Sequence, residues 1–219
     1  RMHKYEEAEP YYNQALVNYI NQIRKFFPYM SEKEKLQFWM SVRNIFEDFT
    51  SFSEDYYKQN QEIAKNVYDN CLITKGLILS STKKIINKIR ESKDKKLINL
   101  LNKWISTKNY WLWLVQNPNK ASELKINIDS IANIANDIEK VISNKSKDFE
   151  NAYKIKEIHW EDVRNVLKPG EAAIEVIRFT KNTFKTKLDE EDRVHYGFLI
   201  ITNETLEHPK FVVLENGNE

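Results

Sequence analysis

The residues of this chain that could take part in chemistry are one cysteine, four histidines and two clusters of charge. Cys71 and a distant histidine could form a thiol nucleophile with its base, because such partners meet in space and not in sequence. Cys71 lies on an apolar helical stripe, however, where burial raises the pKa of a thiol and keeps it protonated. We therefore interpret Cys71 as a buried structural thiol.

The histidines give no pattern typical of a metal site or a catalytic pair. His3, His159, His195 and His208 show no i,i+3 or i,i+4 pairing, and a zinc site would also need cysteines or carboxylates at ligand spacing. His159 precedes Trp160, and we expect it to pack beside that residue. With only 4 Gly there is no glycine-rich phosphate loop. We therefore assign no catalytic, cofactor-binding or metal-binding residue and expect no cofactor.

A basic segment could contact RNA, DNA or an acidic protein surface. It comprises Lys83, Lys84, Lys88, Arg90, Lys93, Lys95 and Lys96. Glu91 and Asp94 interrupt it, and cations are also favoured at helix C-termini, so we interpret it as a solvated helix end and do not expect nucleic-acid binding. The acidic run 189–192 lies in a polar connection, which offers no cleft to shift the pKa of a carboxylate toward acid–base work.

Hydrophobic periodicity predicts helices over the first three quarters of the chain. Ser31 and Glu34 form a capping box, which predicts a helix start, and residues 117–119 are predicted to be a turn. The predicted helices are Tyr5–Phe27, Ser31 to about Phe52, Ser53 or Glu54 to Ser92, Lys93–Gln116, Ala121–Asn144 with a shorter continuation to Tyr153, and His159–Leu167.

The pattern changes at Lys168-Pro169-Gly170, where glycine can take the positive φ that ends a helix. Strands rich in β-branched and aromatic residues are predicted after it, at Ala172–Phe179, Val194–Thr202 and Lys210–Leu214. Neighbouring strands should be antiparallel, and residues 180–193 form a polar connection. So small a sheet should leave an exposed edge through which the chain could self-associate. The predicted class is α+β, mostly α: a bundle of long antiparallel helices followed by a small, incomplete sheet of two to three strands.

Composition limits the class of protein further. The chain has 219 residues and 41% apolar residues, so it can bury a sizeable core. Its net charge of +2 is too small to indicate a polyanionic partner. One cysteine excludes an intrachain disulfide framework and fits a reducing, cytoplasmic location. No apolar run approaches a membrane span and no signal peptide precedes the first helix. The chain opens inside what looks like an ongoing helical repeat, so we expect a fragment of a longer protein.

Four motifs carry a family resemblance. Y-x-x-A-x-x-x-Y-x-x-A-L (5–16) is similar to the second helix of a tetratricopeptide repeat, although His3 stands where that family usually has glycine. The others are F-x-x-x-S-E-K-E-K-L (27–36), V-Y-D-N-C-L-I-T-K-G-L-I-L (67–79) and W-x-x-V-x-x-x-L-x-P-G-E-A (160–172). In this order they resemble the bacterial CHAT proteins, in which tetratricopeptide repeats precede a caspase- and separase-like cysteine peptidase domain.

The resemblance implies three parts: the end of the repeats at 1–27, a helical linker at 28–158 and a truncated start of the CHAT domain at 159–219. In that family the catalytic His and Cys follow later strands, and neither His195 nor His208 matches that position. It thus implies a non-catalytic segment of a cysteine endopeptidase, with a protein partner bound by the repeats or by the rest of the CHAT domain. The alternative is a helical protein–protein interaction module with no enzymatic activity, which adds a partner strand to its sheet edge.

Overall fold

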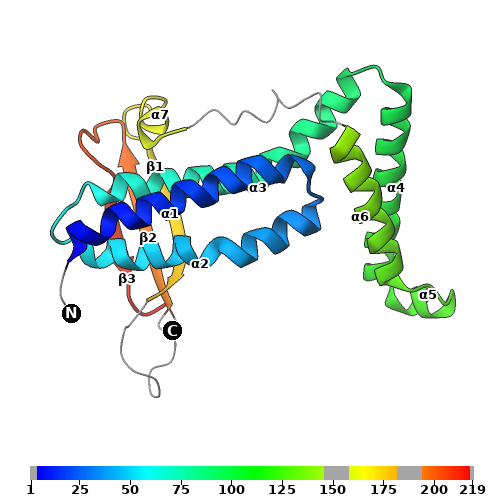
Figure 1. The fold of residues 1–219 in the computed structure, drawn as a ribbon, viewed down its shortest axis with the longest axis horizontal. Coiled ribbons are helices and arrows are strands. Elements are labelled where there is room, and N and C mark those ends of the chain that lie inside the picture. The colour runs from blue at the N-terminus through cyan, green and yellow to red at the C-terminus, as the bar shows by residue number, and fades with distance from the viewer. Residues whose placement is uncertain (1–3, 146–157, 182–193, 218–219) are drawn as a thin grey trace, which may run out of the picture. The chain divides into compact units, whose positions relative to one another are not determined.

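A computed structural model of the chain describes residues 4–145, 158–181 and 194–217, except for the side chains of Pro28 and of residues 76–85. The predicted mostly-α α+β fold is confirmed (Figure 1). Its elements are α1 (Tyr5–Phe26), η1 (Phe27–Tyr29, a 3-10 helix), α2 (Glu32–Tyr56), α3 (Ile63–Glu91), α4 (Lys95–Gln116), α5 (Pro118–Glu123), α6 (Ile128–Lys145), α7 (Trp160–Arg164), β1 (Ala172–Thr180), β2 (Val194–Thr202) and β3 (Lys210–Leu214).

The described residues form two compact units. The first holds residues 4–21, 40–76, 158–181 and 194–217, and the second holds residues 22–39 and 77–145. Helices α1, α2 and α3 each contribute residues to both units. None of the described helices is both long and apolar enough to cross a membrane.

In the first unit, the tyrosine face of α1 packs against the aromatic stripe of α2. The ring of Tyr12 lies 4.7 Å from that of Phe52, and the ring of Tyr5 stacks on Tyr56 at 5.4 Å. Leu16 continues this contact with 2% of its surface exposed. The i,i+3 and i,i+4 spacing that predicted one face on α1 therefore corresponds to a real packing surface.

The predicted start of the third helix at Ser53 or Glu54 is wrong. Helix α2 runs on to Tyr56, and α3 begins at Ile63. The Ser53 hydroxyl donates to the carbonyl of Phe49 at 2.7 Å, four residues back, instead of capping a new helix. A serine inside a helix makes this bond as readily as a serine at an N-cap bonds forward, so residue type alone did not separate the two.

The sheet has the order β1-β2-β3 and is antiparallel throughout, as predicted. One face packs on the helices of the first unit: Phe179, Leu199 and Ile201 are fully buried there. Gly197 lies on the same face, where a Cβ would come within 2.7 Å of the Phe211 ring. The missing side chain therefore makes room for that ring.

In the second unit, α4 and α6 run antiparallel, side by side (Figure 1). Helix α4 begins after Asp94, whose carboxylate accepts hydrogen bonds from the backbone N–H groups of Lys96 and Leu97. These two helices and the end of α3 share a cluster of buried apolar residues, namely Ile89, Leu97, Leu101, Trp104, Ile138 and Ile142.

The predicted turn at 117–119 and the single helix at 121–144 are both wrong. Pro118 instead opens the short helix α5, where a missing N–H is tolerated. The chain then breaks at Lys125, which has a φ of 54°, and α6 starts after Asn127, whose side chain accepts from the N–H of Ser130 at 3.0 Å. The predicted continuation to Tyr153 lies outside the described residues.

The helix-to-strand change falls where the sequence placed it. Helix α7 is shorter than predicted: it ends at Arg164, with Asn165 as its C-cap. Gly170 has the predicted left-handed conformation, with a φ of 85°, but it lies in the separate turn before β1 and does not end the helix. Strands β2 and β3 have the predicted bounds, and β1 extends one residue further, to Thr180. The connection 182–193 lies outside the described residues.

Candidate functional site

Four charged or titratable residues join the sheet to α2 in the first unit. We call Glu54, Asp55, Lys181 and His195 the sheet anchor. Nδ1 of His195, on β2, lies 3.0 Å from Oε1 of Glu54, on α2. Nζ of Lys181, just after β1, lies 2.7 Å from Oε2 of Glu54 and 2.9 Å from Oδ1 of Asp55. Both strands of the β1–β2 hairpin are therefore tied to one turn of α2.

Three of the four side chains of the sheet anchor are nearly buried, and that of Asp55 is 27% exposed. The side chain of His195 is 5% exposed, that of Glu54 10% and that of Lys181 11%. With a neutral imidazole the two carboxylates and one ammonium carry a net charge of −1, and a protonated imidazole makes the set neutral. A desolvated charge that loses its partner costs several kcal/mol, so the hairpin cannot slide on α2 without a large loss of stability.

A second group ties α3 to the chain just before the sheet. We call Asp69, His159 and Trp160 the junction clamp. Oδ1 of Asp69 accepts the backbone N–H of Trp160 at 2.8 Å, and Oδ2 lies 2.7 Å from Nδ1 of His159. Burial raises the pKa of Asp69, and the bonds from His159 and Trp160 only partly offset that rise. Trp160 itself is 2% exposed, so the clamp fixes the start of α7 on α3.

Two further contacts join helices of the first unit to the sheet. Nζ of Lys75, on α3, pairs with the carboxylate of Glu175, on β1. The hydroxyl of Tyr57, just after α2, accepts the backbone N–H of Phe211 at 3.3 Å, and the two rings meet edge to face at 5.7 Å. Helix α2 therefore also contacts β3 through the residue that follows it.

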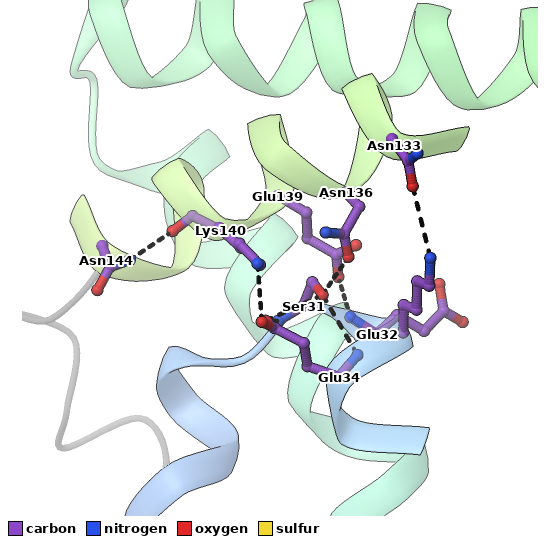
Figure 2. A network of polar contacts seen from close by, with 9 residues as sticks. Ser31, Glu32, Glu34, Asn133, Asn136, Glu139, Lys140 and Asn144 are labelled. Atoms are coloured by element: carbon purple, nitrogen blue, oxygen red, sulfur yellow. Dashed lines mark hydrogen bonds and ion pairs between the residues drawn. The ribbon is translucent and has the colours of Figure 1, made fainter. Parts of the chain in front are cut away.

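In the second unit, side chains of α6 complete the N-terminus of α2 (Figure 2). The predicted capping box is confirmed, because the N–H of Ser31 donates to Glu34 at 3.0 Å and the N–H of Glu34 donates to the Ser31 hydroxyl at 3.3 Å. The Ser31 hydroxyl also donates to Asn136. Oε1 of Glu139 accepts the N–H of Glu32 at 2.9 Å. We call this set, together with Lys140, the cap network.

Two charged residues of this region are nearly fully buried. Lys35 is 5% exposed and Glu139 is 7% exposed. Burial lowers the pKa of Lys35 and raises the pKa of Glu139, while attraction between the two groups opposes both shifts. The Glu139 carboxylate lies at the N-terminus of α2, where it accepts the N–H of Glu32. The positive end of the helix dipole at this point favours the ionised form of Glu139.

An open cavity of about 410 Å³ lies beside the cap network. Nζ of Lys108 is 3.0 Å from the Glu32 carboxylate and 5.8 Å from the centre of the Trp111 ring. Most of the surface that lines the cavity is apolar, and the lining residues are Glu32, Lys33, Leu36, Lys108, Trp111, Ala132, Ala135, Asn136 and Glu139. Its size falls within the range of small-ligand pockets.

Cys71 lies on α3 and keeps part of its residue surface exposed. Its thiol is nevertheless in an apolar environment, and burial raises the pKa to about 12; Lys75 lowers it somewhat and Glu175 adds to the rise. Two histidines of the same unit are held by carboxylates, His159 by Asp69 and His195 by Glu54. These observations support the interpretation of a structural thiol.

The structure separates the other residues that the sequence singled out. His208 lies in the β2–β3 turn, with its ring edge-on to Tyr57 at 6.4 Å. Of the basic segment, Arg90, Lys93, Lys95 and Lys96 are exposed around the α3–α4 turn. His3, the side chains of Lys83 and Lys84, and the acidic run 189–192 lie outside the described residues.

The sequence did not indicate the charged residues that matter most in these contacts. Glu54, Asp69 and Glu139 stand among ordinary surface-type acids in the sequence. One signal was present: Glu139 is four residues after the buried Ala135 and therefore shares the apolar face of α6. Across the parts of the chain that are described, no three His, Cys, Asp or Glu side chains gather in a way that could hold a metal ion.

Comparison with known proteins adds no family to this geometry. A scan against protein-family models finds no match, and searches of curated proteins and of solved structures find none either. The arrangement therefore defines a class only at the level of the fold: a mostly helical α+β chain in which buried charges attach a small antiparallel sheet to helix α2.

Proposed function

We propose that this chain is the non-catalytic helical and first-strand portion of a cytoplasmic bacterial CHAT peptidase, and that it links partner-sensing tetratricopeptide repeats to a caspase-like protease core. The family motifs in the sequence suggest this assignment. The observation that favours it is the sheet anchor, because a segment with a linking role needs its helices fixed to the strands that lead into the core.

The proposed mechanism is transmission of a helix movement to the sheet. Partner binding at the repeats shifts α2 or α3, which move as packed units. Glu54 then displaces β1 and β2 together through Lys181 and His195, because breaking the buried contacts would cost more than moving the hairpin. Asp69 moves the start of α7 in the same way. The strands that align the catalytic His and Cys of the core respond to this displacement.

The first test is the complete open reading frame, which should encode a His and a Cys after later strands. The full-length protein is then treated with iodoacetamide, and the rate of labelling at that Cys is followed by mass spectrometry. Glu54→Ala should change this rate, because the anchor no longer holds the hairpin that leads to the site. Glu47→Ala is the matched control, since Glu47 is an acid on the same helix in a half-exposed pair with Arg43 at 3.8 Å.

Each outcome separates the parts of the proposal. A reading frame without the downstream His and Cys would reject the peptidase assignment altogether. A reading frame that has both, with equal labelling in Glu54→Ala and Glu47→Ala, would keep the peptidase and reject transmission through the sheet anchor.

The second candidate is a helical interaction module that binds a partner by strand addition. The observation that favours it is the position of β1, a strand of nine residues that is at the edge of the described sheet. Main-chain N–H and C=O groups along such an edge can pair with an extended peptide or with a second copy of the chain. Replacing Ile174 with proline should abolish a complex of this type, because the ring blocks pairing at the edge. A complex that survives the change would refute edge pairing.

A further inference from the structure

One face of the sheet is partly exposed in the described part of the chain, and of its strand residues only Val194 is buried. We call the even-numbered side chains of β1, β2 and β3 the outer face. Ile174, Val176 and Leu214 on this face are 54%, 46% and 50% exposed, whereas Phe179 and Leu199 on the opposite face are fully buried. Ile174 and Val176 lie on β1 and Leu214 on β3, and the half-buried Phe198 of β2 lies between them. Apolar side chains therefore continue across all three strands, as in surfaces that typically bind a partner.

The strand register orders this patch around one residue. Phe198 pairs with Val176 on one side and with Val212 on the other, so it is the centre of the outer face. Ile174 lies one pair further along β1, and Leu214 lies one pair further along β3 in the opposite direction. Ile174, Phe198 and Leu214 therefore form an apolar diagonal across the three strands.

The three rows of paired residues around Phe198 form a square whose corners are Ile174, Leu214, Arg178 and Lys210. The last two corners, which lie off the apolar diagonal, are cationic. Arg178 pairs with Tyr196, which also pairs with Leu214, so Arg178 and Leu214 share one row of the sheet. Lys210 pairs with Ile200, which also pairs with Ile174, so Lys210 lies in the other outer row. The apolar diagonal thus has one cation on each side. Among the described strand residues of this face there is no carboxylate.

The two cations indicate what kind of partner the outer face binds. A second copy of the chain would add two more cations, its own Arg178 and Lys210, and the described strand residues of the two outer faces would hold no carboxylate to neutralise the four. An amphipathic helix with carboxylates on both sides of its apolar stripe places opposite charge at both corners. At a strand spacing of about 4.8 Å and a rise of about 3.3 Å per residue, the diagonal is about 16 Å long. Three turns of helix cover that length.

We infer that the outer face binds an amphipathic helix of a partner protein, with its apolar stripe along the Ile174–Phe198–Leu214 diagonal and its acidic flanks against Arg178 and Lys210. This surface is distinct from the β1 edge and from the sheet anchor, and it does not depend on the chain being part of a peptidase. In many complexes, an amphipathic helix packs its apolar face on an apolar surface while charged residues on its flanks pair with opposite charges around that surface.

The test uses two synthetic helical peptides that share one apolar stripe and differ only in having Glu or Lys on both flanks. Binding to the 219-residue chain is followed by fluorescence anisotropy, and the contact surface is mapped from the methyl NMR signals of Ile174 and Val176. The Glu-flanked peptide should bind about tenfold more tightly than the Lys-flanked one, and this preference should weaken with salt. Arg178→Glu with Lys210→Glu should reverse the preference. Lys58→Glu with Lys168→Glu, at exposed positions off this face, should leave it unchanged.

Three results would overturn the inference. The first is a failure of the Glu-flanked peptide to bind the unaltered chain. The second is equal binding of both peptides, which would show that Arg178 and Lys210 do not favour acidic flanks over basic ones. The third is a dimer of the chain, seen by sedimentation and lost in Val176→Asp, which would make a second copy the occupant. Circular dichroism of each variant shows whether the fold is intact before binding is compared.

Discussion

Removing the Glu54 carboxylate should open the sheet locally without unfolding the whole chain. Glu54 holds His195 at 3.0 Å and Lys181 at 2.7 Å, and all three side chains are at most 11% exposed. Removing one partner of a buried ion pair costs about 3 to 5 kcal/mol. Asp55 still pairs with Lys181 at 2.9 Å in Glu54→Ala, so we expect the lower end, about 3 kcal/mol.

Native-state hydrogen exchange measures this locally. A loss of about 3 kcal/mol should lower the protection of the β2 amides by about a hundredfold, while the α4 and α6 amides of the second unit keep theirs. Glu54→Gln retains an oxygen that can accept from His195 and loses only the charge, so its effect should be smaller, about tenfold. Glu47→Ala, in a half-exposed pair, should change protection less than about threefold.

The reasoning fails if Glu54→Ala lowers the protection of β2 by less than about fivefold, which corresponds to about 1 kcal/mol. It also fails if the loss is spread equally over both units. In that case the residue would stabilise the chain as a whole and would not serve as a local attachment for the hairpin.

Three further predictions concern the cap network and Cys71. Ser31→Ala removes the N-cap hydroxyl of α2 and should lower the free energy of unfolding by about 1 kcal/mol, measured by urea denaturation. The pKa of Glu34 lies below its ordinary value of 4.5, because its bonds to Lys140 and Ser31 outweigh its burial. The ionised Glu34 therefore stabilises the fold above about pH 4.5, and this stabilisation is lost as the pH falls through the lower pKa of the folded state. In Glu34→Gln, the urea midpoint should depend less on pH in this acid range than it does in the unaltered chain. Near neutral pH, the dependence of the midpoint on pH should be the same in both. Burial raises the pKa of the Cys71 thiol to about 12 from an ordinary 9.0. Its reaction with a disulfide reagent at pH 8 should therefore be about a thousandfold slower in the folded chain than in the chain unfolded by urea. Equal rates in the two states would contradict the burial of this thiol.

Much of the local structure followed from residue pattern alone. The capping box at Ser31 and Glu34, the left-handed conformation of Gly170 before the first strand and the bounds of β2 and β3 all depend on neighbours within a few residues, which the sequence displays directly. The misplaced boundaries are those where one residue type serves two local roles. Ser53 bonds backward within α2, and Pro118 opens a helix instead of a turn, and both outcomes depend on how the following residues pack.

The candidate sites could be predicted much less well. Glu54 and His195 are 141 residues apart in sequence, and Asp69 and His159 are 90 apart. No periodicity links such pairs, so they look like ordinary charged residues until the chain is folded.

The sequence by itself determined the class of the fold, the junction at Gly170 and the alternation that gives each strand two faces, because each of these follows from the preferences of nearby residues. Only the tertiary structure decided which face of the sheet is covered and which acids are buried with a partner. The reason is that burial and charge pairing are properties of groups brought together by folding, and the energy of a carboxylate such as Glu54 changes by several kcal/mol between water and a desolvated contact with Lys181.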